Sequence, residues 1–167
     1  MILWRISNYA DLLGIGGLQI AGRWHNRGIP VVYLSENPAL AMLEVLVHFE
    51  LAPDEVPENF QLLEVDYAQR KSIARLQADA LADGWQNDIE LTRAIGDEWL
   101  AAGGSALLRV PSAVVPRSFN YLFNPRHPEA EMAHILSVTR HPYDARLLEA
   151  FGSPSHPLPI GAQPPTP

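Results

Sequence analysis

The sequence predicts an α+β fold, in which strands and helices follow one another without regular alternation. No GxGxxG or Walker sequence opens a helix after a strand, and this argues against a doubly wound nucleotide-binding sheet. The chain has 167 residues, enough for one domain with a hydrophobic core of its own. No internal repeat with a period of about 20 to 50 residues is visible, so a solenoid is excluded.

Composition narrows the class further. The chain is 47% hydrophobic and 19% charged, which is typical of a globular protein. The absence of cysteine excludes disulfide scaffolds, thiolate metal sites and cysteine nucleophiles. A net charge of −7 disfavours direct nucleic-acid binding. Met1–Arg5 does not begin a secretory signal, and no apolar run reaches the roughly 18 residues of a membrane span. We therefore expect a cytoplasmic protein without membrane contact.

The N-terminal third combines strands, a loop and one helix. A β-branched and aromatic run predicts a strand at Val31–Leu34. Pro38, with Asn37 or Ser35 as the N-cap, begins an apolar helix that extends to about Phe49. Two further segments are a short strand at Leu3–Ile6 and an ordered, glycine-rich loop at Leu12–Gly28.

The remaining elements are less regular. A helix over Asp88–Ala102 ends at Gly103-Gly104, and the long segment Pro111–Pro128 has no predicted element. Six prolines in Ser153–Pro167 predict an extended tail, so we divide the chain into a domain at 1–152 and a tail at 153–167. The other predicted elements are strands at Phe60–Asp66, Ala106–Val110 and Ala133–Val138, and helices at Ser72–Leu81 and near Tyr143–Phe151.

Glu44 is the most informative polar residue. It interrupts the apolar run Ala39–Val47, and His48 lies one helical turn further along. Because burying an unpaired carboxylate costs several kcal/mol, this face of the helix opens onto a cleft or meets an arginine. A surface glutamate on a narrow solvent-facing stripe is the plainer alternative.

Two other segments carry groups that suit a polar ligand. Gly22–Gly28 contains Arg23 and Arg27 between glycines, an arrangement that can grip a diphosphate but also fits an ordinary turn. Pro111–Pro128 collects serine, asparagine, arginine and histidine side chains. The histidines are scattered and no HExxH or GxSxG sequence is present, so we expect neither a metal site nor a serine hydrolase.

Three segments, taken in order, resemble the RES domain family. They are GRW at 22–24, VVYLSENPALAMLEVLVHFE at 31–50 and DEWLAAGGSALLRVPSAVVPRSFNYLFNPRHP at 97–128. The resemblance extends from about Leu3 to Tyr143. The family takes its name from an Arg, a Glu and a Ser, which match Arg23, Glu44 and Ser112 here. One position departs from the pattern, because the residue after GRW is often Asn in the family and is His25 in this chain.

The resemblance implies a fold and an activity. Family members are toxins of bacterial toxin–antitoxin pairs, with an ADP-ribosyltransferase-like fold of two small, mostly antiparallel sheets around an NAD-binding cleft with flanking helices. They deplete NAD by cleaving the nicotinamide–ribose bond, and ADP-ribosyl transfer to protein is also ascribed to them. NAD is then the substrate, phosphate is a possible co-substrate, and no cofactor is needed. An Xre-type helix-turn-helix antitoxin is the implied partner, and a homodimer within that complex is possible for the family.

The implied site has catalytic and substrate-binding residues. Arg23 would hold the diphosphate, Tyr33 would stack on nicotinamide, and Glu44 would stabilise the positive charge on the ribose. The implied substrate-binding residues are Ser112, Asn120, Arg27 and Trp24. Two rival functions are an RNA-cleaving toxin, which the negative charge disfavours, and a non-catalytic binding module. In the binding module, Arg23 and Glu44 would form a buried structural ion pair.

Overall fold

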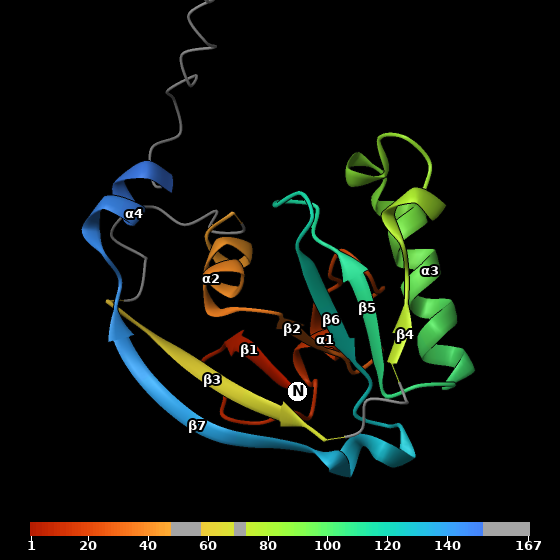
Figure 1. Cartoon of the computed structure of the whole chain (residues 1–167), viewed down its shortest axis with the longest axis horizontal. Coiled ribbons are helices and arrows are strands. Elements are labelled where there is room, and N and C mark those ends of the chain that lie inside the picture. The colour runs from red at the N-terminus through yellow and green to blue at the C-terminus, as the bar shows by residue number, and fades with distance from the viewer. Residues whose placement is uncertain (48–57, 69–72, 152–167) are drawn as a thin grey trace, which may run out of the picture.

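The computed structural model describes residues 1–47, 58–68 and 73–151, which form one mixed β-sheet with helices packed against it (Figure 1). The strand order is β4-β5-β6-β2-β1-β3-β7. The strands are β1 (Ile2–Ile6), β2 (Val32–Ser35), β3 (Asn59–Tyr67), β4 (Ile73–Arg75), β5 (Leu107–Pro111), β6 (Phe119–Phe123) and β7 (Ala133–Pro142). The helices are α1 (Gly16–Gln19), α2 (Pro38–Leu46), α3 (Ile89–Ala102) and α4 (Ala145–Phe151), with 3-10 turns η1 (Ala78–Ala80), η2 (Trp85–Asn87) and η3 (Pro128–Met132).

The predicted α+β class is confirmed, but the structure has one sheet rather than the two that were expected. The sheet is mostly antiparallel, and only β4 and β5 pair in parallel. Its weakest joint lies between β1 and β2, which pair only through Trp4 and Ser35. Figure 1 shows the strands on either side of this joint running in different directions. A single pairing is enough to join the two halves, yet it lets them diverge and leaves space between them.

Two hydrophobic clusters hold the sheet and its helices. One lies on the central strands and includes Leu3, Val65 and Phe123. The other lies between the sheet and α3, where Trp24 and Trp85 pack with their ring centroids 5.7 Å apart. Through this second cluster, the segment before β2 is fixed against α3 although the two are distant in sequence.

Capping residues set the bounds of the two longer helices. The Asn37 side chain accepts a hydrogen bond from the backbone N–H of Leu40, so Asn37 is the N-cap of α2. Asp88 caps α3 in the same way, and Gly103 ends it with a left-handed φ of 57°. Helix α2 ends at Leu46, and the predicted continuation to Phe49 lies outside the described residues.

Two predicted elements of the C-terminal two thirds are wrong. Within Ser72–Leu81 the described residues form strand β4 and turn η1 instead of a helix, because Ile73 and Ala74 pair with buried residues of β5. The segment Pro111–Pro128 contains β6, whose aromatic and buried sequence FNYLF forms the inner strand next to β2. Neither element shows strict alternation, and tertiary pairing determines both.

Other predictions are confirmed within a few residues. The strands expected at Leu3, Val31, Phe60, Ala106 and Ala133 correspond to β1, β2, β3, β5 and β7. The proline-rich tail at 153–167 lies outside the described residues. No helix in the described part of the chain is long and apolar enough to cross a membrane.

Helix α3 contacts the 22–24 segment so closely that position 96 has no room for a side chain. A Cβ added to Gly96 would overlap the carbonyl oxygen of Trp24 and lie 2.8 Å from its carbonyl carbon. Because both partners are backbone atoms, no rotamer change relieves the overlap. We expect Gly96→Ala to lower the free energy of unfolding by about 1–3 kcal/mol or more, measured by urea denaturation.

Gly104→Ala is the matched control. Gly104 is exposed, a Cβ there meets nothing within 4 Å, and its φ is not positive. Its variant should unfold within about 0.5 kcal/mol of the parent protein. Equal stability of the two variants would contradict the close contact between α3 and Trp24.

Candidate active site

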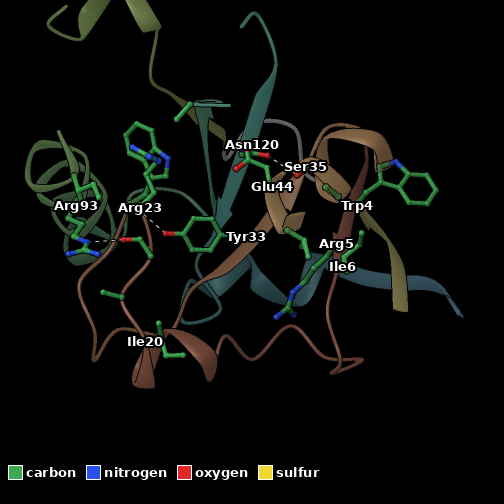
Figure 2. A pocket seen from close by; sticks show the side chains of 17 residues that line it. Trp4, Arg5, Ile6, Ile20, Arg23, Tyr33, Ser35, Glu44, Arg93 and Asn120 are labelled. Carbon is green, nitrogen blue, oxygen red and sulfur yellow. Dashed lines mark hydrogen bonds between the residues drawn. The ribbon is translucent and has the colours of Figure 1, made fainter. Parts of the chain in front are cut away.

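A cavity lies where β1 and β2 separate, between α2 on one side and α3 on the other (Figure 2). Its volume is about 500 Å³, within the range of small-molecule sites. Apolar side chains such as Ile20, Val45 and Ile89 form much of its wall. Figure 2 shows Arg23 and Arg93 on one side of Tyr33, and Glu44 with Ser35 and Asn120 on the other.

Glu44 extends from α2 into this cavity and is half-buried. Its Oε1 accepts two short hydrogen bonds, 2.7 Å from the hydroxyl of Ser112 and 2.6 Å from the side-chain amide of Asn120. Asn120 is itself oriented by the Ser35 hydroxyl, which donates to its Oδ1 at 2.7 Å. No hydrogen-bond partner of Oε2 lies among the described residues. One carboxylate oxygen is therefore fixed, and the other is available to a ligand.

The hydroxyl of Ser112 is directed to Glu44 rather than into the cavity. It follows β5, where its Oγ accepts hydrogen bonds from the backbone N–H groups of Val114 and Val115 at 3.1 and 3.0 Å. With these two bonds accepted, its own proton is directed to Glu44. Ser112 is buried and does not line the cavity, whereas Asn120 does.

The turn 22–26 carries Arg23 to the other end of the cavity. Its backbone is held by α3: Thr92 Oγ1 donates to the carbonyl oxygen of Arg23 at 2.7 Å, and Arg93 Nε donates to that of Gly22 at 2.9 Å. Asp97 accepts from the backbone and side-chain amides of Asn26 at 3.0 and 2.7 Å. The side chain of Arg23 donates through Nη1 to the carbonyl oxygen of Gln86 at 2.7 Å. Hydrogen bonds thus fix both the backbone position of Arg23 and the direction of its side chain.

Three arginines and a single glutamate line the cavity. The net charge of this lining is therefore positive, although the net charge of the whole chain is negative. Besides Arg23, these are Arg93 from α3 and Arg5 from β1. The two Nη groups of Arg93 have no partner among the described residues, while Arg5 Nη1 donates to the carbonyl oxygen of Asp11 at 2.7 Å. Burial lowers the pKa of Arg5, and the charge of Asp11 opposes that shift. A guanidinium nevertheless stays protonated in proteins.

Tyr33 occupies the middle of the site. Its hydroxyl accepts from the backbone N–H of Trp24 at 3.0 Å and lies 2.9 Å from Nδ1 of His25. Burial raises the pKa of Tyr33 well above its usual value, so the hydroxyl stays protonated at neutral pH. The aromatic ring lines the cavity, while the hydroxyl is engaged with the turn.

The structure therefore gathers some of the predicted residues and leaves others aside. Arg23, Tyr33, Glu44 and Asn120 line one cavity, and Ser112 contacts Glu44 directly. Trp24 lines it too, but its side chain is only 2% exposed and packs against Trp85, which is a structural contact. Arg27 is exposed and does not line the cavity. His48 lies outside the described residues.

Two alternatives lose support. No ion pair joins Arg23 to Glu44 in the described part of the chain, which argues against a buried structural bridge between them. Glu44 is also not a surface residue on a solvent-facing stripe, because Ser112, which follows β5, and Asn120 from β6 hold it in the cavity. Among the described residues, no three His, Asp or Glu side chains are grouped to hold a metal ion.

Several residues of the site give no signal in the sequence. Arg93 adds a second cation next to Arg23, and Thr92 and Asp97 hold the turn that carries it. These residues share a region of α3, but their importance depends on a contact with a segment about 70 residues away in the chain. The one hint in the sequence is Gly96, which lies between them and whose lack of a side chain allows the close contact with Trp24.

Comparisons with known proteins concern the family and the fold. The RES domain model matches residues 2–145. A toxin named Res from Pseudomonas putida is 50% identical over 135 residues, covering 81% of this chain and 92% of that protein. A Prs ADP-ribosylating toxin from Sphingobium is 33% identical over 155 residues, covering 87% and 95%.

A solved structure gives a similar fold. The crystal structure of the M. tuberculosis MbcT–MbcA toxin–antitoxin complex contains a chain that aligns with a TM-score of 0.69 and 16% identity, covering 90% of this chain and 88% of that one. At that identity the likeness concerns the fold. The family model and the relatives, in contrast, span most of the sequence. The chain therefore belongs to the RES domain family of toxins.

Proposed function

We propose that this chain is a toxin that cleaves the nicotinamide–ribose bond of NAD and thereby depletes it. The observation that carries the proposal is Glu44, with Oε1 held by Ser112 and Asn120 and Oε2 available inside an apolar-walled cavity. The relative from Sphingobium that is named an ADP-ribosylating toxin supports the same substrate, because ADP-ribosylation begins with cleavage of this bond.

Glu44 has the chemistry that this bond requires. When nicotinamide leaves, the ribose develops an oxocarbenium-like positive charge, as sugars do in glycoside hydrolysis. A carboxylate fixed in a partly apolar site stabilises such a charge more strongly than one in water, and it need not reorganise during the reaction. In this arrangement Oε2 of Glu44 interacts with the ribose, while Ser112 and Asn120 keep the carboxylate in place.

The cationic end of the cavity suits the diphosphate. Arg23 and Arg93 offer planar groups of donors on one side of Tyr33, and such groups bind phosphate oxygens in pairs. In this role Arg93 is a stronger candidate than the exposed Arg27. The Tyr33 ring, between the arginines and Glu44 in Figure 2, provides a flat surface for the nicotinamide ring.

No side-chain nucleophile is required in this mechanism. The ribosyl cation is captured by water, by inorganic phosphate or by a side chain of a target protein. The last of these is the second candidate function, protein ADP-ribosylation, and the name of the Sphingobium relative favours it. The two candidates use the same cavity and differ in the acceptor.

A protein partner is also part of the proposal. The fold neighbour is the toxin of a toxin–antitoxin complex, and we infer that this chain is neutralised by an antitoxin of the Xre type. Adding the purified antitoxin should suppress nicotinamide release by this chain. Full activity in its presence would contradict the pairing.

The first of three predictions about substitutions in the cavity region concerns Glu44. We expect purified protein without antitoxin to release nicotinamide from NAD, and Glu44→Gln to reduce kcat by at least about 10²-fold, because the charge is lost while the shape is kept. Chromatography with and without phosphate identifies the acceptor, since water gives ADP-ribose and phosphate gives its 1″-phosphate. A melting curve shows whether the variant is folded. No release by folded parent protein in either buffer would favour protein-directed transfer or a non-catalytic binding module.

The second prediction tests whether Ser112 acts through Glu44. Ser112→Ala should lower kcat by about tenfold or more, because Glu44 loses one of its two donors. In the Glu44→Gln background the same substitution should cost no more than about twofold, which a double-mutant cycle measures. Ser112→Thr keeps the hydroxyl and is the matched control. Equal losses in both backgrounds would show that Ser112 acts independently of Glu44.

The third prediction compares two arginines. Arg93→Gln should raise KM for NAD by about tenfold, the effect of losing one charged contact to phosphate. Arg27→Gln is matched in chemistry, and its effect on KM should be clearly smaller because Arg27 is exposed and outside the cavity. If Arg27→Gln has the larger effect, the diphosphate does not bind at the Arg93 side.

A further inference from the structure

His25 lies at the centre of a small network beneath the turn that carries Arg23. It is buried, with 3% of its surface exposed. Its Nδ1 lies 2.9 Å from the Tyr33 hydroxyl and 3.1 Å from the backbone nitrogen of Gly22. Gly22 cannot be larger, because a Cβ there would lie 2.5 Å from the Tyr33 hydroxyl and 2.9 Å from the imidazole. Hydroxyl, imidazole and turn therefore form one closely packed unit.

The direction of each hydrogen bond in this unit follows from its donors. The backbone N–H groups of Gly22 and Trp24 can only donate. That of Gly22 is shared between the backbone carbonyl oxygen and Nδ1 of His25, both at 3.1 Å, and that of Trp24 goes to the Tyr33 hydroxyl. Once the Tyr33 oxygen accepts from Trp24, its own proton points to Nδ1 of His25. Nδ1 thus accepts from the Tyr33 hydroxyl, is only one of two acceptors near the Gly22 N–H, and carries no proton. The proton of the neutral ring is then on Nε2, which is buried and has no hydrogen-bond partner among the described residues.

Several charged groups surround His25. Asp97 and Arg93 face it from α3, Arg23 belongs to its own turn, and Tyr33 faces it from β2. Burial lowers the pKa of His25 below its usual value of 6.5, while Asp97 opposes and Arg93 adds to this shift. At neutral pH the imidazole is therefore uncharged, as the hydrogen bond that Nδ1 accepts from Tyr33 requires.

We propose that His25 is a positioning residue, whose unprotonated Nδ1 ties the Tyr33 hydroxyl to the turn 22–25 and so keeps Arg23 ready to bind substrate. The proposal rests on the proposed function, since Arg23 and Tyr33 are taken as substrate-binding groups. A proton on Nδ1 would face the N–H of Gly22 and leave the Tyr33 proton without its acceptor. The Tyr33 hydroxyl is accordingly a structural donor, and only its ring meets the ligand.

Protonation has a defined consequence for both stability and binding. Because the native pKa is lowered, the unfolded state binds the proton first, and stability falls as pH decreases from about 6.5 toward the native pKa. Below the native pKa this contribution does not fall further. Substrate binding should weaken in the region of the native pKa, because the Tyr33 hydroxyl then loses the acceptor that ties it to the turn. The loss should appear in KM rather than in kcat, since Glu44 is held by Ser112 and Asn120, which lie outside this network.

Three forms of the protein test the proposal. His25→Asn keeps an acceptor, because its Oδ1 can occupy the place of Nδ1, and it does not titrate. His25→Leu removes the acceptor at every pH. Steady-state kinetics of nicotinamide release from pH 5 to 8.5 should show that kcat/KM of the parent falls on the acid side, below pH 6.5. His25→Leu should be about tenfold lower in kcat/KM at pH 8, and His25→Asn should recover most of that loss without the acid-side fall.

Two measurements without NAD keep the assignment independent of the activity. Imidazole ¹⁵N NMR of the parent protein should show the proton on Nε2 at pH 7.5, and a proton on Nδ1 would overturn the proposal. Melting temperatures of the parent should fall relative to His25→Asn as pH decreases below 6.5. An unchanged acid-side fall in His25→Asn, or a loss in kcat alone, would also overturn it. No nicotinamide release by the parent at pH 8 would contradict the proposed function, while the NMR result would still decide the role of His25.

Discussion

The two hydrogen bonds to Oε1 of Glu44 are the constraint on which the Glu44 end of the cavity depends. A carboxylate in a partly apolar cavity is tolerated only when donors compensate for lost water. Here the donors come from the end of β5 and from β6, while the carboxylate comes from α2. The pairing of Ser35 with Asn120 in the β2–β6 ladder brings the amide to its place. The position of the Glu44 carboxylate therefore depends on the register between β2 and β6.

The opposite end of the cavity is built by a different rule. The turn that carries Arg23 exposes backbone carbonyl and N–H groups to a packed environment, and each needs a partner. Helix α3 supplies most of them through the side chains of Thr92, Arg93 and Asp97, while Gly96 permits the close approach. Arg93 holds the turn and also lines the cavity, so one side chain supports the turn and forms part of the cavity wall.

Local signals in the sequence predicted what local interactions determine. Asn37, Pro38 and the interruption at Glu44 are all neighbours in the chain, so the helix, its cap and its candidate site residue could be identified together. Strand β4 and the clamp on Arg23 depend on partners far away in sequence, and local propensity carries no trace of them. The resemblance to a family supplied Ser112 as a site residue, but only the structure shows that its hydroxyl is directed to Glu44 rather than to open space.

The single pairing between β1 and β2 explains why these two ends face one cavity. A full ladder of pairs would keep β1 and β2 side by side along their length. The one pair at Trp4 and Ser35 instead lets the two halves of the sheet diverge. The divergence exposes Arg5 and Ile6 from one half, and Tyr33 and Ser35 from the other, to the same space. A chain of net charge −7 can then attract an anion locally, because the field inside a cavity with apolar walls depends mainly on the charges that line it. The weak joint of the sheet is thus the feature that gives an acidic α+β domain a cavity whose charged lining is mainly positive.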